Sequence, residues 1–450
     1  MDQDIIFTPL QFRNLQVKNR IFRSSISGRF DNEDGSLTQT RINWECMFAK
    51  GGTGAIISSY VPVLMEGRII AGYATVHRDE YISYWQKLGE AVHSFDNCKF
   101  IMQLSHSGRQ MDIPGVHNYT RRALSSTSRK ESLHGFLCRA MSRQEIDHTV
   151  GAFARGAWRA REAGLDGVEL HAANGYLFTQ FLSSGINDRK DEYGGSLANR
   201  TRFLLDVIQA IRAEVGSGFH LQVKISAIDR NNVIPWEGKG NTLQDSVQVA
   251  RWCEAAGADA MHVSTGSLFP HPLNPPGDFS FETITATYDA MISSGVDTLR
   301  NYFLFRYRAL RPVFRWIWFR MKRGLPVEGI SLDEARAIKA AVKIPVLSTG
   351  GWQTASKIRA AISDDSCDGV AIARSLVANP DLPRFWKSGE DLPPRPCTYC
   401  NRCLLNAPKN PMGCYEPKRF PSHEAMVEQL MTIYKAHPIL RVPDPAEISL

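Results

Sequence analysis

Three polar side chains that could bind and protonate a substrate lie on and just after one apolar stretch of the chain. The run DGVELHAA (166–173) and the residues that follow it supply His171, Asn174 and Tyr176. Imidazole and amide N–H groups can hold a carbonyl oxygen, and a phenol can deliver a proton. Because a free phenol has a pKa of about 10, Tyr176 would carry its proton at neutral pH. Alternatively, the three residues only line the end of a strand and take no part in chemistry.

A second set of residues has the composition of a phosphate site. Gly350 and Gly351 end the apolar run PVLSTGG, and Ala373 and Arg374 end the run DGVAIAR. Backbone N–H groups at a glycine turn and a neighbouring guanidinium are frequent phosphate ligands. Together, the glycine pair and the arginine on the next run predict a phosphate site.

Four of the nine cysteines crowd into PCTYCNRCLLNAPKNPMGCYEP with the spacing C-x2-C-x2-C-x10-C; they are Cys397, Cys400, Cys403 and Cys414. Thiolates at this spacing can hold a [4Fe–4S] cluster or a zinc ion, and the alternative is a segment without metal. The N-terminus has no long apolar core after a basic start. We therefore expect no secretory signal and a cytoplasmic chain with reduced thiols.

The segment 298–324, TLRNYFLFRYRALRPVFRWIWFRMKRG, interleaves basic and aromatic residues and contains no acidic residue. Its charges recur too often for a membrane span. It could form a lid over a pocket, a pair of helices bent at Pro312 that contacts an anionic membrane peripherally, or a contact with a partner or a second copy. The density of aromatic residues argues against nucleic acid.

Eight apolar, strand-like runs alternate with amphipathic helical patterns, and they cover 19–27, 52–59, 99–106, 166–173, 220–227, 259–266, 345–351 and 368–374. With no early GxGxxG loop, this order favours an α/β fold of the (β/α)8 barrel type over an open sheet. We expect the barrel over 1–388, an insertion at 270–328 after the sixth strand, and a cysteine-containing extension at 389–450. A barrel brings the ends of its strands together, so the two sets of residues above would share one site.

The block HAANGYLFTQFLSSGINDRKDEYGGSLANRTRFLLDVI closely resembles the signature of the Old Yellow Enzymes and the wider NADH:flavin oxidoreductase family. The similarity continues in FTPLQFRNLQVKNRI, QLSHSGRQ and VKISA, and it covers most of 5–388 outside the insertion. The resemblance implies a (β/α)8 barrel that binds FMN and takes a hydride from NADH or NADPH. It further implies that His171 and Asn174 hold the carbonyl oxygen of an α,β-unsaturated substrate, and that Tyr176 protonates the α-carbon.

The resemblance also implies the contacts with FMN. Gln103 and Lys224 would touch the pyrimidine edge of the ring, where a cation suits the negative charge of reduced flavin. The residues expected under the ring are Ser24, Ser25 and Ser27, and those expected at the phosphate are Gly350, Gly351, Ala373 and Arg374. Tyr60 is also expected to contact the flavin. Two positions depart from the family: Ser27 replaces the usual Thr or Cys, and Tyr60 stands where a small residue is common.

Taken together, these patterns predict an FMN-dependent ene-reductase driven by NADH or NADPH. The cysteine segment is similar to the cluster-binding segment of dienoyl-CoA reductase and trimethylamine dehydrogenase, although the gap before its third cysteine is one residue shorter than theirs. An enzyme of that kind with a [4Fe–4S] cluster is one alternative, and a non-catalytic, membrane-associated flavin-binding protein is another. The physiological substrate, the preferred nucleotide and the oligomeric state stay open.

Overall fold

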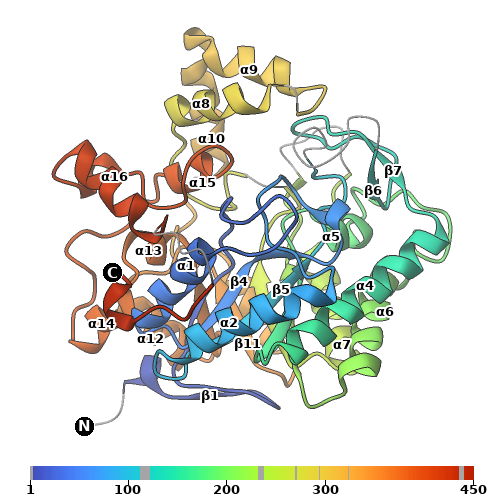
Figure 1. Ribbon diagram of the computed structural model, residues 1–450. Coiled ribbons are helices and arrows are strands. Elements are labelled where there is room, and N and C mark those ends of the chain that lie inside the picture. The colour runs from blue at the N-terminus through green and yellow to red at the C-terminus, as the bar shows by residue number, and fades with distance from the viewer. Residues whose placement is uncertain are drawn as a thin grey trace.

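Eight parallel strands close into a barrel in the computed structural model (Figure 1), which describes residues 4–111, 122–231, 238–268, 271–292, 294–322, 324–434 and 440–450. Neighbouring strands follow one another around the barrel in chain order. They are β3 (Ile21–Arg23), β4 (Ala55–Pro62), β5 (Lys99–Ser105), β8 (Gly167–Ala172), β9 (His220–Ser226), β10 (Ala260–Ser264), β11 (Val346–Thr349) and β12 (Gly369–Ile372). The predicted (β/α)8 architecture is confirmed.

Helices between consecutive strands surround the barrel, namely α1 (Gln39–Lys50), α2 (Ile82–His93), α4 (Arg143–Glu162), α6 (Leu197–Val215), α7 (Leu243–Ala256), α11 (Leu332–Lys339) and α12 (Ala355–Ser363). Local sequence sets several of their ends. Ser142 caps α4 together with Glu145, and Thr242 caps α7 together with Asp245. Gly257 ends α7 in the left-handed region, at φ 112°.

An N-terminal hairpin closes the lower end of the barrel. Its strands β1 (Leu10–Gln11) and β2 (Gln16–Val17) pair antiparallel. Side chains of the hairpin join inward-facing side chains of the barrel in one apolar cluster, made of Leu10, Phe12, Leu15, Val17, Phe22, Ala55, Ile57, Ile101, Ala260, Leu347 and Ala371. The barrel floor is therefore a packed apolar layer, and polar chemistry is left to the upper end.

The chain between β10 and α11 forms a layer of helices above the barrel (Figure 1), consisting of α8 (Phe281–Met291), α9 (Thr298–Arg306) and α10 (Arg311–Met321). The expected bend at Pro312 is wrong. The chain turns through a short 3-10 segment, Arg308–Leu310, and Pro312 lies in the first turn of α10. Proline fits there because the first turn of a helix needs no N–H from it.

The remaining elements decorate the barrel. They are a small sheet of β6 (Ala123–Ser125) and β7 (Cys138–Ala140), and the helices α5 (Leu177–Leu182), α13 (Arg374–Ala378), α14 (Leu382–Lys387), α15 (Arg402–Asn406) and α16 (His423–Met431). Across the described ranges, every helix is too short or too polar to span a bilayer.

Candidate active site

A cavity of about 320 Å³ lies at the carboxyl ends of the barrel strands. It is lined by all thirteen residues predicted to take part in catalysis or FMN binding: Ser24, Ser25, Ser27, Tyr60, Gln103, His171, Asn174, Tyr176, Lys224, Gly350, Gly351, Ala373 and Arg374. These residues come from seven of the eight strands or the turns that follow them. The barrel therefore gathers both predicted sets around one space.

A tight turn after β8 presents the three residues that could bind and protonate a substrate. Asn174 and Gly175 both have left-handed backbones, at φ 61° and 83°. Only glycine fits at the second position, because a Cβ on Gly175 would lie 2.0 Å from the carbonyl oxygen of Ser267. The turn brings the rings of His171 and Tyr176 to a centroid distance of 4.9 Å.

Burial sets the protonation states of these two rings. It lowers the pKa of His171 well below its usual range, and the charge of Lys224 acts in the same direction. Burial also raises the pKa of Tyr176 far above its usual value, with a further contribution from Tyr73. At neutral pH the cavity thus offers a neutral imidazole and a protonated phenol.

A buried polar layer lies directly beneath the cavity. Gln103 Nε2 donates to Glu169 Oε1 at 2.7 Å, and His262 Nδ1 lies 2.7 Å from Glu169 Oε2. Burial alone would raise the pKa of Glu169, but His262, Lys224 and Gln103 stabilise the anion and lower the pKa to about 2. The layer therefore contains an ionised carboxylate facing the buried ammonium of Lys224.

Two groups in this region remain available to a ligand. Gln103 Oε1 is buried and has no hydrogen-bond partner among the described residues. Lys224, a residue that is 4% exposed, makes one hydrogen bond through its ammonium group to the described residues, a long one of 3.4 Å to Ser24 Oγ. A planar ligand that carries an N–H beside a carbonyl oxygen would satisfy the acceptor and the cation together.

The predicted phosphate end of the cavity combines a glycine turn and a helix start. Gly350 and Gly351 have φ of 147° and 66°, and α13 begins at Arg374 without a side-chain cap. The Arg374 guanidinium donates from Nη1 to Pro276 O and to Asn401 Oδ1, both at 2.6 Å. Arg374 therefore links the barrel to the insertion and to the C-terminal extension while lining the cavity.

The sequence did not reveal which residues roof the cavity. From α8 come Ile284, Thr287, Tyr288 and Met291, and from the C-terminal extension come Cys403, Leu404, Leu405, Ala407, Pro408 and Met412. Thr287 Oγ1 donates to the carbonyl oxygen of Leu405, so the two segments are joined over the site. Glu169 and His262 were also missed, although strand alternation signals them: Glu169 precedes His171 by two positions and so points into the barrel.

The four clustered cysteines line a second, smaller cavity beside the first, and Cys403 lines both. None of the nine cysteines forms a disulfide. Arg419 Nη1 donates to Cys414 Sγ at 3.2 Å, and burial raises the pKa of Cys400 to about 11. Within the described residues, no group of His, Cys, Asp or Glu side chains is arranged to hold a metal ion.

Similar proteins include reductases and oxidases that are longer than this chain. The NADH oxidase of Thermoanaerobacter brockii is 30% identical over 439 residues, which cover 94% of this chain and 59% of the relative. The cinnamate reductase of Clostridium sporogenes is 27% identical over 424 residues, covering 90% of this chain and 56% of the relative. The chain thus spans less than two thirds of the length of these relatives.

Solved structures with the same fold include a 2-naphthoyl-CoA reductase in complex with 2-naphthoyl-CoA and a morphinone reductase. The first has a TM-score of 0.72 at 23% identity and covers 91% of this chain and 56% of its own. The second has a TM-score of 0.65 at 22% identity and covers 87% and 91%.

Two family models match the chain. The dihydrouridine synthase model matches residues 321–415, which include the predicted phosphate site and all four clustered cysteines. The model of the NADH:flavin oxidoreductase / NADH oxidase family matches residues 5–291, which is well over half of the chain. The protein is therefore a member of the NADH:flavin oxidoreductase / NADH oxidase family.

Proposed function

We propose that the protein binds FMN and uses NADH or NADPH to reduce a carbon–carbon double bond conjugated to a carbonyl group. The observation that carries this proposal is the cavity at the barrel mouth, where a neutral His171, the Asn174 amide and a protonated Tyr176 meet above a buried cation. The cinnamate reductase relative supports it, since cinnamate contains such a double bond.

The donors and acceptors of the cavity suit FMN. Gln103 Oε1 is a buried, unpaired acceptor that the ring N3–H would satisfy, and Lys224 would face the oxygen at C2. Gly350 and Gly351, with Arg374 and the uncapped start of α13, would hold the phosphate. Ser27 also lines the cavity, and its small side chain leaves room for a flat ring.

Bound FMN would supply the redox chemistry, namely a hydride derived from NADH or NADPH for the β-carbon of the substrate. His171 and Asn174 hold the substrate carbonyl oxygen by hydrogen bonds and stabilise the negative charge that grows on it. Tyr176 then gives its proton to the α-carbon. The double bond gains one hydride and one proton, and the phenol recovers its proton from water.

An anaerobic titration tests this function. The purified protein should show flavin absorption bands that bleach with NADH or NADPH and return on addition of 2-cyclohexenone. Protein that stays colourless after incubation with FMN would refute the cofactor, and bands that bleach but never return with any enone would refute the reaction. The second result would favour an amine-dehydrogenase-like enzyme or a non-catalytic flavin-binding protein.

A second candidate is an enzyme that carries a [4Fe–4S] cluster and acts on an acyl-CoA thioester or an amine. Four thiols around one small cavity favour it, and Cys403 also borders the flavin cavity.

Iron and sulfide analysis of anaerobically purified protein tests the cluster. About four irons per chain are expected in the wild type. Cys400→Ser should lower the iron content, and Cys253→Ser, which alters a buried thiol on α7, should not. Iron at background level in the wild type would exclude the cluster and leave the ene-reductase proposal standing.

A further inference from the structure

The helical layer above the barrel has two different faces. Its inner face is packed: Trp318 lies 4.6 Å from Phe279 between ring centroids, and Phe305 lies 5.3 Å from Tyr288. Trp318 Nε1 also donates to Gly277 O at 3.0 Å. The aromatic side chains of the inner face therefore pack within the molecule. Through α8, this face also forms part of the roof of the cavity at the barrel mouth.

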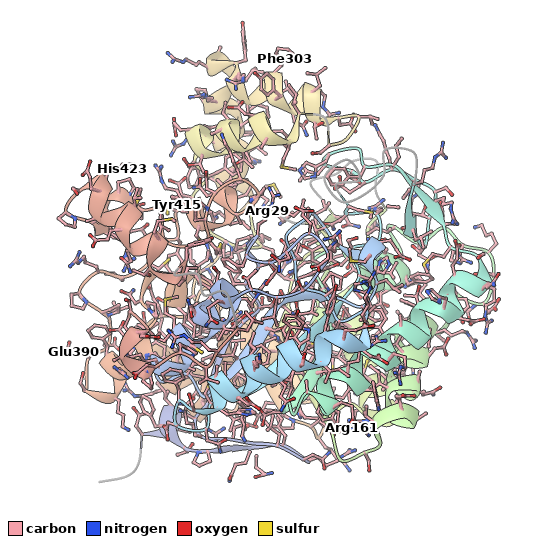
Figure 2. The ribbon with its side chains drawn as sticks, viewed as in Figure 1. Arg29, Arg161, Phe303, Glu390, Tyr415 and His423 are labelled. Carbon is pink, nitrogen blue, oxygen red and sulfur yellow. The ribbon has the colours of Figure 1, made fainter. Side chains whose placement is uncertain are left out.

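On the outer face, large apolar side chains are exposed to solvent. We call this face the aromatic tip; it consists of Ile292, Val296, Leu299, Phe303, Tyr307, Val313, Trp316, Ile317, Phe319 and Leu325. Ten of the sixteen exposed large apolar residues of the described chain lie here, and Phe303 and Trp316 are 61% and 59% exposed. In Figure 2, Phe303 lies at the outermost edge of the molecule, away from the barrel. A patch of this kind marks an interaction surface.

Basic residues accompany the apolar side chains of the aromatic tip along the chain. Residues 298–324 contain eight arginines and lysines and no acidic residue. Four of these pair with carboxylates, among them Arg306 with Asp289 and Arg300 with Asp297. Arg308 and Arg320 have no ion pair among the described residues and project with the exposed aromatics, Arg320 lying 5.0 Å over the ring of Trp316. The surface is thus apolar and cationic together.

We propose that the aromatic tip docks the protein onto an anionic lipid bilayer. Exposed Trp, Phe and Ile beside unpaired Arg is the composition of an interfacial membrane anchor, whose apolar groups enter the headgroup region while guanidinium groups bind lipid phosphates. The tip projects from the molecule (Figure 1), which suits a bilayer because a bilayer needs no matching concave partner. A second copy of the chain fits less well, since it would bring two basic surfaces together.

Docking in this orientation would place the membrane next to the cavity. The helix α8 supplies Tyr288 and Met291 to the cavity roof, and the chain continues directly from α8 into the tip at Ile292. The active site and the docking surface are therefore built on the two sides of one layer of helices.

Co-sedimentation of the full-length protein with vesicles tests the proposal. Wild-type protein should bind vesicles of phosphatidylcholine with phosphatidylserine, and it should bind pure phosphatidylcholine vesicles much more weakly. Binding should weaken in high salt because the charges are exposed. The double variant Phe303→Ser, Trp316→Ser and the double variant Arg308→Glu, Arg320→Glu should each bind about tenfold more weakly or worse.

The matched control is the double variant Leu392→Ser, Met431→Ser, which removes exposed apolar side chains outside the tip. It should bind as the wild type does, and all variants should keep their flavin content and circular dichroism. The proposal would be overturned if the wild-type protein did not bind anionic vesicles, or if the tip variants bound them as well as the control variant does. A concentration-dependent dimer that the tip variants abolish, without vesicle binding, would assign the surface to a second copy instead.

Discussion

Asn274, from the insertion, donates a hydrogen bond from Nδ2 to Asn174 Oδ1 at 2.9 Å. The same Nδ2 donates to the carbonyl oxygen of Thr265 at 2.6 Å, which only an amide nitrogen can do. The orientation of Asn274 is therefore fixed by a backbone carbonyl, and it fixes the orientation of Asn174 in turn. Asn174 must then offer its own Nδ2, and not its oxygen, to a substrate in the cavity.

Replacing Asn274 should weaken the hydrogen bond from Asn174 to the carbonyl oxygen of the substrate. Asn274→Ala frees the Asn174 amide to rotate, and we expect kcat/KM for an enone to fall about five- to thirtyfold, equivalent to about 1–2 kcal/mol. Asn274→Asp should be at least as damaging, because a carboxylate would draw the Asn174 Nδ2 toward itself. Steady-state kinetics with 2-cyclohexenone measures both.

Asn301→Ala is the matched control. It tests whether any loss of a hydrogen bond that holds the insertion in place lowers activity. Asn301 Nδ2 donates to Leu133 O and to Tyr288 Oη, so its loss disturbs the helical layer without touching Asn174. We expect a smaller effect on kcat/KM than for Asn274→Ala. Equal losses in the two variants would mean that Asn274 acts only by holding the insertion in place.

Tyr176→Phe should separate the two half-reactions. The phenol is needed only when the α-carbon takes its proton, so reoxidation of the reduced flavin by an enone should slow by about 100-fold or more. Reduction by NADH or NADPH should keep its rate within a small factor. Stopped-flow absorption of the flavin follows each step, and Tyr84→Phe, on the outer helix α2, serves as the control. Equal slowing of both steps would contradict the role of proton donor.

The rate of enone reduction should be nearly independent of pH between about pH 6 and 9. His171 has its pKa lowered well below this range by burial and by Lys224, so it stays neutral throughout. Tyr176 has its pKa raised above the range by burial, so it stays protonated. Single-turnover rates across this range check the assignment, and a severalfold fall within it would show that one of the two groups titrates there.

The barrel and the rim of the site follow from local sequence, whereas the roof does not. Each strand is a short apolar run, and residues such as His171 and Lys224 stand at or near strand ends, where a barrel must bring them together. The contact of Tyr288 with the cavity depends on how α8 packs against the C-terminal extension, and no periodicity of either segment encodes that packing. The turn at Arg308–Leu310 was misplaced for a similar reason: proline starts a helix as readily as it breaks one.

Glu169→Gln should destabilise the fold most above pH 4.5 and have little effect only below about pH 2, the pKa of Glu169 in the folded state. Its pKa is lowered from 4.5 to about 2, a shift that corresponds to about 3 kcal/mol of stability. A lowered carboxyl pKa stabilises the folded state above the unfolded pKa, and this contribution is lost as pH falls through the folded pKa. At pH 7 the variant also leaves Lys224 buried without its counter-charge.

Urea unfolding at pH 7 should therefore give a free energy of unfolding about 3 kcal/mol lower for the variant than for the wild type. This difference between the two proteins should narrow between pH 5 and pH 3. Glu162→Gln, at an exposed pair with Arg161, should change stability by less than about 0.5 kcal/mol. A gap that is the same at pH 3 and pH 7 would mean that Glu169 contributes through packing and not through its charge.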